Sequence, residues 1–117
     1  MAVIPVVAAP GSYLATPVGA GSRDVAFTTM SGGADTFVST GRELVLFFNS
    51  TGGALTVTIT SQVDAQQRKG DITTYSIGAG LYSLFGPLAV DGWRDASGNV
   101  TITASAATLK VLVIRLP

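Results

Sequence analysis

The residues from Leu55 to Thr60 alternate strictly between aliphatic side chains and threonine, and this constrains the fold more than any other feature of the chain. Because successive side chains of a β-strand point to opposite faces, the pattern predicts a strand with one buried and one polar face. Further short runs rich in β-branched and aromatic residues are separated by Gly, Asn and Asp, and no stretch has a helical period. They cover Glu43–Asn49, Ile72–Ile77, Leu81–Leu88, Asn99–Ser105 and Leu109–Leu116. About six such strands predict an all-β protein, an antiparallel β-sandwich or jelly-roll-like single domain over residues 41–117.

Two of these runs are apolar on both faces. Glu43–Asn49 contains the neighbours Phe47 and Phe48, which point to opposite faces of a strand, and Leu109–Leu116 has the same two-sided character. A two-sided strand lies inside a sandwich or against a partner, so Leu109–Leu116 is predicted to be a central strand. Turn-forming residues at Ser50–Gly53 predict that the runs on either side of them form a hairpin.

The first 22 residues carry no charge and are interrupted by Pro5, Pro10 and Pro17. Proline fixes φ near extended values, so the segment is expected to be an extended arm and not a membrane-spanning helix. We assign residues 1–40 to this arm and its lead-in. Three alternatives remain open, because the arm can cover an edge of its own sheet, lie on a neighbouring subunit or be disordered. Its exposed aliphatic side chains would favour a contribution to assembly more than to the folding of residues 41–116.

The chain contains no cysteine and no histidine, and its seven basic residues balance seven acidic ones. The absence of thiol and imidazole groups excludes disulfides, thiol nucleophiles and His-based triads, and it argues against zinc and haem sites. Neither GxxxxGK[ST] nor GxGxxG occurs. We therefore expect no enzyme, no cofactor and no metal site. The neutral charge predicts neither a nucleic-acid partner nor a membrane partner.

Hydrophobic residues make up 47% of the chain, and the mean hydropathy is +0.48. A domain of this size exposes much of its surface to water and does not need so many apolar side chains for its core alone. The surplus predicts an interface between subunits.

The loop from Asp91 to Asn99 holds the remaining candidates for chemistry. Asp91 and Asp95 are close in sequence, as the carboxylate pair of a hydrolase can be, but Asp side chains in such loops commonly cap turns. The spacing of the loop's oxygen ligands does not match a calcium-binding EF-hand. Trp93 fits packing in a core or an interface, and it also fits an aromatic platform that stacks on a sugar. The aromatic residues expected beside it are Tyr75, Tyr82 and Phe85.

Several segments of the chain together resemble a known group of proteins. They are GRELVLFFN at 41–49, LTVTITS at 55–61, RKGD at 68–71, FGP at 85–87 and DGWR at 91–94. This set resembles small virion proteins of tailed bacteriophages, of the head decoration or cement type, over residues 41–116. The resemblance implies a β-rich module, often trimeric, that binds the outside of a capsid shell and reinforces it without catalytic residues.

A capsid decoration protein on the virion exterior is the function that follows from the resemblance. Its partners would be the major capsid protein and further copies of itself, as a homotrimer. The candidate interface residues are Val3, Ile4, Val6, Val7, Phe47, Phe48 and Trp93. An attachment module on a tail or fibre, binding host-surface carbohydrate through Trp93, is the alternative, and a small hydrolase using Asp91 and Asp95 is a third hypothesis.

Overall fold

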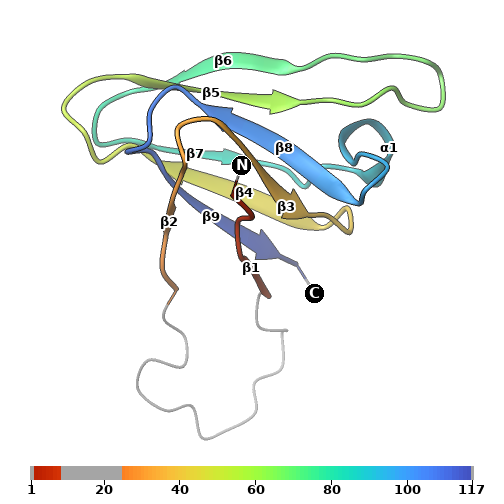
Figure 1. Cartoon of the computed structure of the whole chain (residues 1–117), viewed down its shortest axis with the longest axis horizontal. Coiled ribbons are helices and arrows are strands. Elements are labelled where there is room, and N and C mark those ends of the chain that lie inside the picture. The colour runs from red at the N-terminus through yellow and green to blue at the C-terminus, as the bar shows by residue number, and fades with distance from the viewer. Residues whose placement is uncertain (1, 9–24, 117) are drawn as a thin grey trace, which may run out of the picture.

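The computed structural model describes residues 2–8 and 25–116, which form nine strands and one short helical turn. The strands are β1 (Val6–Ala8), β2 (Thr28–Thr29), β3 (Ala34–Val38), β4 (Glu43–Phe48), β5 (Leu55–Thr60), β6 (Ile72–Ile77), β7 (Tyr82–Phe85), β8 (Asn99–Ala104) and β9 (Lys110–Arg115). The helical turn, α1 (Val90–Trp93), lies between β7 and β8. Strands β4 to β9 lie close to the runs that the sequence predicts, whereas β1, β2 and β3 lie in the residues assigned to the arm and its lead-in, and the chain is all-β as expected (Figure 1).

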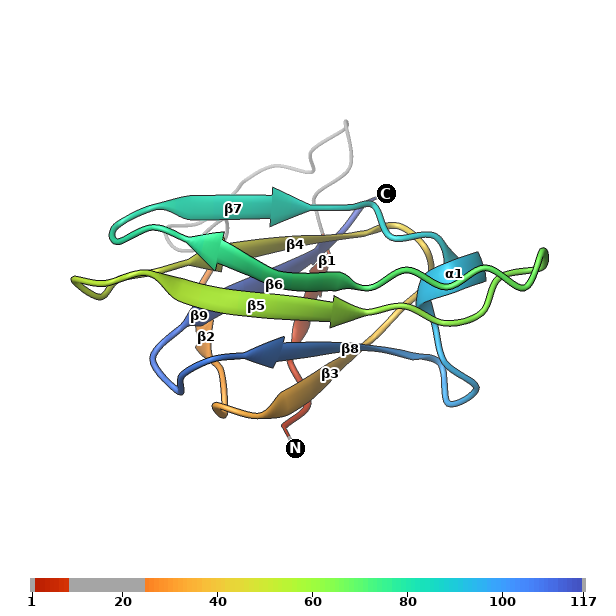
Figure 2. The ribbon, with the colours of Figure 1, turned by 90° about the horizontal axis from the view of Figure 1, so that it is seen from above.

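The strands form two sheets that pack as a sandwich. The first sheet has the order β1-β9-β4-β7, with β2 also paired to β9, and the second has the order β3-β8-β5-β6. Seen from above, β5, β6 and β8 lie in front of β4 and β9 (Figure 2). All pairings between the named strands are antiparallel except that of β1 with β9. The strand order of β2 to β9 is that of a jelly roll, which confirms the predicted fold class.

The core lies between the two sheets. Along β4, buried and half-buried residues alternate, so that Val45 and Phe47 point into the sandwich and Leu44, Leu46 and Phe48 point away from it. Phe37, Val57 and Ile102 complete the fully buried interior from the second sheet. The strand β9 is central, with β4 on one side and β1 and β2 on the other, as its two-sided sequence predicts.

The predicted hairpin between residues 43–49 and 55–60 is wrong. The strand β4 belongs to the first sheet and β5 to the second, so residues 49–54 connect the two sheets. The side chain of Asn49 holds this connection, because its amide nitrogen donates to the carbonyls of Gly53 at 2.7 Å and Ile77 at 2.9 Å. Its amide oxygen accepts the backbone N–H of Thr51 at 3.0 Å. Turn residues at this position therefore stabilise an arch between sheets.

The N-terminal residues cover edges of their own domain, which is one of the alternatives that the sequence left open. Ile4 N donates to Thr36 O at 2.7 Å and Thr36 N to Ala2 O at 3.0 Å, so residues 2–4 extend the second sheet beside β3. After Pro5 the chain crosses to the first sheet, where Val6–Ala8 pairs with β9. Ile4 is 1% exposed and lies in the core. The part of the predicted arm from Pro10 to Ser22 lies outside the described residues.

Asp35 fastens these N-terminal residues to β3. Its buried carboxylate accepts the N–H of Ala2 at 3.0 Å, and the N–H and hydroxyl of Ser31 at 2.9 and 2.5 Å. Burial alone would raise the pKa of Asp35, but the hydrogen bonds from Ser31 and Ala2 outweigh it and hold the pKa below its usual value. Since β3 is part of the second sheet, the boundary expected at residue 41 falls inside the sandwich.

A second buried carboxylate, that of Glu43, lies where β4 begins. Thr40 donates to it from its backbone nitrogen and its hydroxyl, both at 2.7 Å, and Arg115 Nε donates at 2.5 Å. Burial alone would raise the pKa of Glu43, but the hydrogen bonds from Arg115, Thr40 and Arg42 lower it to about 2. The ionised carboxylate joins the loop before β4 to β9 at the centre of the first sheet.

Gly86 is expected to be intolerant of any side chain. Its φ is +108°, and an added Cβ would lie 2.7 Å from the carbonyl oxygen of Glu43. We expect Gly86→Ala to lower the free energy of unfolding by about 1–3 kcal/mol, because alanine is strained at positive φ and collides with backbone that cannot move aside. Gly53→Ala is the matched control, since an added Cβ there meets nothing within 4 Å. Equal urea-denaturation midpoints for the two variants would contradict this account.

Candidate functional site

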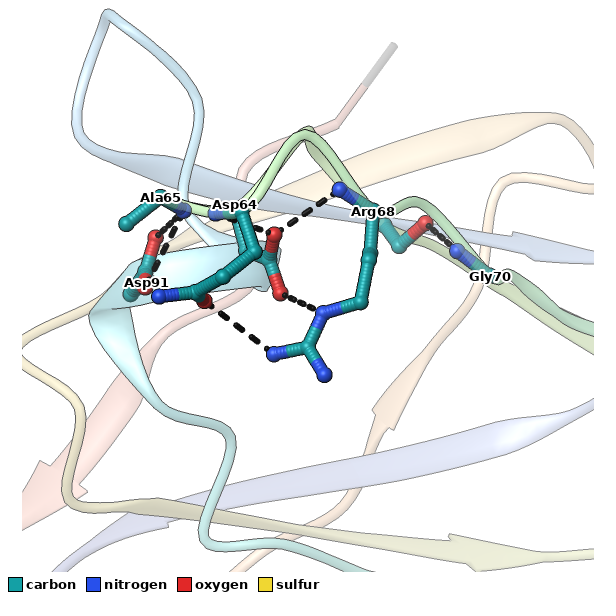
Figure 3. Close-up of polar contacts among 7 residues, drawn as sticks. Asp64, Ala65, Arg68, Gly70 and Asp91 are labelled. Atoms are coloured by element: carbon teal, nitrogen blue, oxygen red, sulfur yellow. Dashed lines mark hydrogen bonds and ion pairs between the residues drawn. The ribbon is translucent and has the colours of Figure 1, made fainter.

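A polar pocket opens at the end of the sandwich where the β5–β6 loop meets α1. It has a volume of about 320 Å³. Its walls include Gln62, Asp64, Arg68, Lys69, Asp91 and Trp93. Figure 3 shows that Asp64 and Arg68 come from the loop, and that Asp91 reaches the same loop from α1.

Asp64 organises the loop. Its carboxylate accepts the backbone N–H groups of Gln66 at 2.9 Å and Arg68 at 2.8 Å, and the Nε of Arg68 at 2.9 Å (Figure 3). The backbone N–H of Arg68 is the main cause that lowers the pKa of Asp64, and the other hydrogen bonds add to it. The Arg68 side chain is 74% exposed, so this ion pair is solvated and contributes little to stability. Asp64 therefore stabilises the conformation of the β5–β6 loop.

The two carboxylates considered for hydrolysis are engaged with different backbone groups. Asp91 accepts the N–H of Ala65 at 3.1 Å, whereas Asp95 accepts those of Ser97 at 2.9 Å and Asn99 at 3.0 Å. Asp95 thus caps its own turn, as such residues commonly do, and Asp91 ties α1 to the β5–β6 loop. Within residues 2–8 and 25–116, no three His, Cys, Asp or Glu side chains are grouped so that they could hold a metal ion.

Trp93 forms one wall of the pocket but does not gather the expected aromatic neighbours. It is half-buried and packs against the core cluster. Tyr75 instead packs edge-on against Phe85, with ring centroids 5.2 Å apart, and Tyr82 stacks on Phe48 at 4.3 Å. Of the two alternatives for Trp93, packing against the core is therefore the one observed, and the described aromatic residues form no platform around it. Any ligand in the pocket would meet this ring among polar groups.

The second candidate surface is the side of the first sheet that points away from the core, which we call the outer face. It carries Leu44, Leu46 and Phe48 of β4, Tyr82 and Leu84 of β7, Val7 of β1, and Leu112 and Ile114 of β9, together with one charged residue, Lys110, at the start of β9. Tyr82 is 59% and Leu84 62% exposed. Phe27 packs against both Phe48 and Tyr82, with ring centroids 6.0 and 6.3 Å apart. Clustered exposed apolar side chains of this kind mark sites of contact with other molecules.

The structure separates the predicted interface residues into accessible and inaccessible ones. Ile4 and Phe47 lie in the core of their own chain, at 1% and 0% exposure, so they are not available to a partner. Val6 packs against that core as well. Val7 and Phe48 are half-buried on the outer face, and Val3 is 72% exposed. Tyr82 and Leu84 are not among the interface residues predicted from the sequence. The signal that could have identified them is the absence of charge on their strand, which is typical of a contact surface.

Comparison of the chain with protein-family models, with curated proteins and with solved structures finds no match. Among the described residues, no helix has the length and apolar character needed to cross a bilayer.

Proposed function

We propose that this chain is a structural virion protein that decorates the outside of a bacteriophage head and stabilises it through protein–protein contacts. The observation that carries the proposal is the apolar outer face of the first sheet. The two carboxylates considered for catalysis hold different loops, and the outer face combines exposed Tyr82 and Leu84 with half-buried apolar neighbours, which suits it to contact with another protein. The resemblance of residues 41–116 to head decoration proteins supports the same role.

A decoration protein stabilises a shell because its binding is thermodynamically linked to the closed state of the shell. Each square ångström of apolar surface covered by a partner contributes about 25 cal/mol before the entropy cost of association is subtracted. A protein that binds the closed shell but not its separated subunits stabilises the shell by the free energy of that binding. Several copies that hold one another multiply the effect through effective concentration, and the resemblance implies three. The major capsid protein is the partner in this proposal.

The fold itself supports more than one function, because jelly rolls occur among viral capsid proteins and among lectins. The distinction therefore depends on which surface binds. The outer face favours decoration, and the polar pocket beside Trp93 favours the carbohydrate-binding alternative.

Heads that lack the chain, made from the genome that encodes it, provide the direct test. We expect the purified protein to bind them saturably in co-sedimentation and to raise the temperature at which they release DNA. Ile114→Lys, which places a charge on the outer face, should weaken binding by about tenfold or more, since it opposes burial of an apolar contact. Val63→Lys is the matched control, because Val63 is exposed in a loop away from that face. Absence of binding by the unaltered protein would refute the proposal.

The alternative, attachment to host carbohydrate, has its own readout. On a glycan array, binding that is lost in Trp93→Ala and in Arg68→Ala but kept in Tyr82→Ala would favour the pocket over the outer face. Arg68 is 74% exposed, so its replacement tests the pocket without disturbing the core on which Trp93 packs.

A further inference from the structure

The sandwich has edges that differ in how they are protected. At β3, residues 2–4 pair with the edge. The edge strand β6 is irregular, because its register with β5 shifts between Val57 and Ile59 and Thr74 has a φ of +45°. The strands β1 and β2 are only three and two residues long. Short strands, irregularities and added cover are the usual means by which proteins keep sheet edges from pairing with other chains.

Among the described residues, the strand β7 has no added cover and no irregularity of register, and it is longer than β1 and β2. Its four residues pair with β4 in unbroken antiparallel register, and it pairs with no other described strand. No charged residue occurs between Ile72 and Val90, so the lysines that commonly blunt an edge are missing as well. Leu81, Tyr82 and Leu84 are each more than half exposed. An uncharged, regular and exposed edge is suited to accept another strand.

The hydrogen bonds between β4 and β7 determine which backbone groups of β7 point toward its free edge. Asn49 N donates to Leu81 O, so the backbone of Leu81 points toward β4, and by alternation so do those of Ser83 and Phe85. The N–H and C=O groups of Tyr82 and Leu84 therefore point away from β4, toward the free edge. Two donors and two acceptors are available there for a neighbouring strand.

We propose that β7 pairs antiparallel with β7 of a second copy, about a two-fold axis at Ser83. In this register Tyr82 and Leu84 of one copy lie opposite Leu84 and Tyr82 of the other. These residues carry the outward-pointing backbone groups, so four hydrogen bonds join the copies. The inference does not rest on the proposed function.

A second copy fits this edge better than an unrelated segment does. An antiparallel edge is self-complementary, because the same groups meet after a two-fold rotation. The absence of charge means that no like charges are opposed, and aromatic–aliphatic pairs such as Tyr82 with Leu84 stabilise neighbouring strands. Of the described strands, β7 lies outermost on its side, beyond β6 (Figure 2). The outer faces of both copies then form one continuous surface, on which Lys110 is the charged residue.

A single engineered cysteine tests the register, since the chain has no cysteine of its own. Residues opposite each other in a non-hydrogen-bonded pair have Cα atoms about 4.5 Å apart, which a disulfide can span. We expect Ser83→Cys, oxidised at micromolar concentration, to run at twice the 11.9 kDa chain mass and to return to one chain mass on reduction. Ser76→Cys, on the exposed edge strand β6, is the control and should stay at one chain mass. Equal cross-linking of the two variants would overturn the proposal.

A charge on the edge tests the pairing without cross-linking. Light scattering of the unaltered protein should give twice the chain mass, and Leu84→Lys should weaken the association about tenfold or more, as edge lysines oppose strand pairing. Val38→Lys, at a position of β3 in the second sheet that is 51% exposed, should leave the mass doubled. A monomer, or a trimer that Ser83→Cys does not cross-link, would overturn the two-fold pair. The proposal would also be overturned if the Leu84→Lys protein kept the dimer mass but no longer bound heads, because β7 would then pair with a segment of the capsid.

Discussion

Replacing Ile4 by alanine is expected to lower the free energy of unfolding by about 2–5 kcal/mol, although this residue stands near the start of an uncharged, proline-rich segment. The reason is that Ile4 is 1% exposed and packs in the core between the two sheets. Truncating a buried aliphatic side chain removes its transfer free energy and leaves a cavity. Urea denaturation followed by circular dichroism measures the change.

Val3 provides the matched control, because it is the neighbouring residue and 72% exposed. Val3→Ala should change the free energy of unfolding by less than about 0.5 kcal/mol, as surface substitutions usually do. Equal stability of the Ile4→Ala and unaltered proteins would mean that residues 2–8 do not contribute to the folded domain. Such a result would restore the expectation that this segment serves assembly and not folding.

Replacing Glu43 by glutamine is expected to cost about 2–3 kcal/mol at neutral pH, because it removes the buried carboxylate that accepts hydrogen bonds from Thr40 and from the half-buried guanidinium of Arg115. The unaltered protein should also lose stability in acid. The pKa of Glu43 falls from 4.5 in the unfolded chain to about 2 on folding, so its ionised form contributes about 3 kcal/mol above pH 4.5. This contribution is lost progressively as the pH falls from 4.5 to about 2.

Urea denaturation at several pH values between 7 and 2.5 tests this account. The Glu43→Gln protein should lose less stability over that interval than the unaltered protein, and the remaining acid sensitivity should include that of Asp35, whose pKa is also lowered. Asp64→Asn is the control, because the Asp64 ion pair is solvated and its loss should leave the denaturation midpoint at neutral pH nearly unchanged. Parallel pH profiles for Glu43→Gln and the unaltered protein would contradict the assignment.

The strands were predictable where the side chains alternate. Leu55–Thr60 matches β5 residue for residue, because a half-buried strand imposes a period of two on its sequence. Ile72–Ile77 matches β6 as well, through its β-branched and aromatic composition and not through alternation. The position of β9 was predictable for a related reason, since a strand with apolar residues on both faces must be covered on both.

Connections between strands were less accessible from the sequence. The residues Ser50–Gly53 favour a turn, but a turn within one sheet and an arch between two sheets use the same residue types. What decides between them is the bond from Asn49 to the carbonyl of Ile77, which is distant in sequence. The strand β3 was missed because Asp35 is polar in sequence and buried in the fold, where Ala2 and Ser31 satisfy its carboxylate.

The candidate site was predictable only in part. Trp93 lines a pocket because α1 contacts the β5–β6 loop through the hydrogen bond from Ala65 to Asp91. The two segments are distant in sequence, so no local sequence pattern predicts this contact. Phe47 and Phe48 are adjacent and chemically identical, so the sequence could assign them to two faces but not say which face is internal. The lack of charge between Ile72 and Val90 is the signal that could have identified the exposed residues of β7.

The order of strands in the two sheets determines when the chain can fold. Consecutive strands from β3 to β9 lie in different sheets except for β5 and β6, so most pairings join segments distant in sequence. Such topologies fold slowly, in milliseconds to seconds. Since β9 pairs with β1, β2 and β4, the first sheet lacks its centre until residues 110–115 have been synthesised. On the ribosome, the uncharged strands β6 and β7 are therefore made before the sandwich can close, so they remain exposed to other nascent chains during that interval.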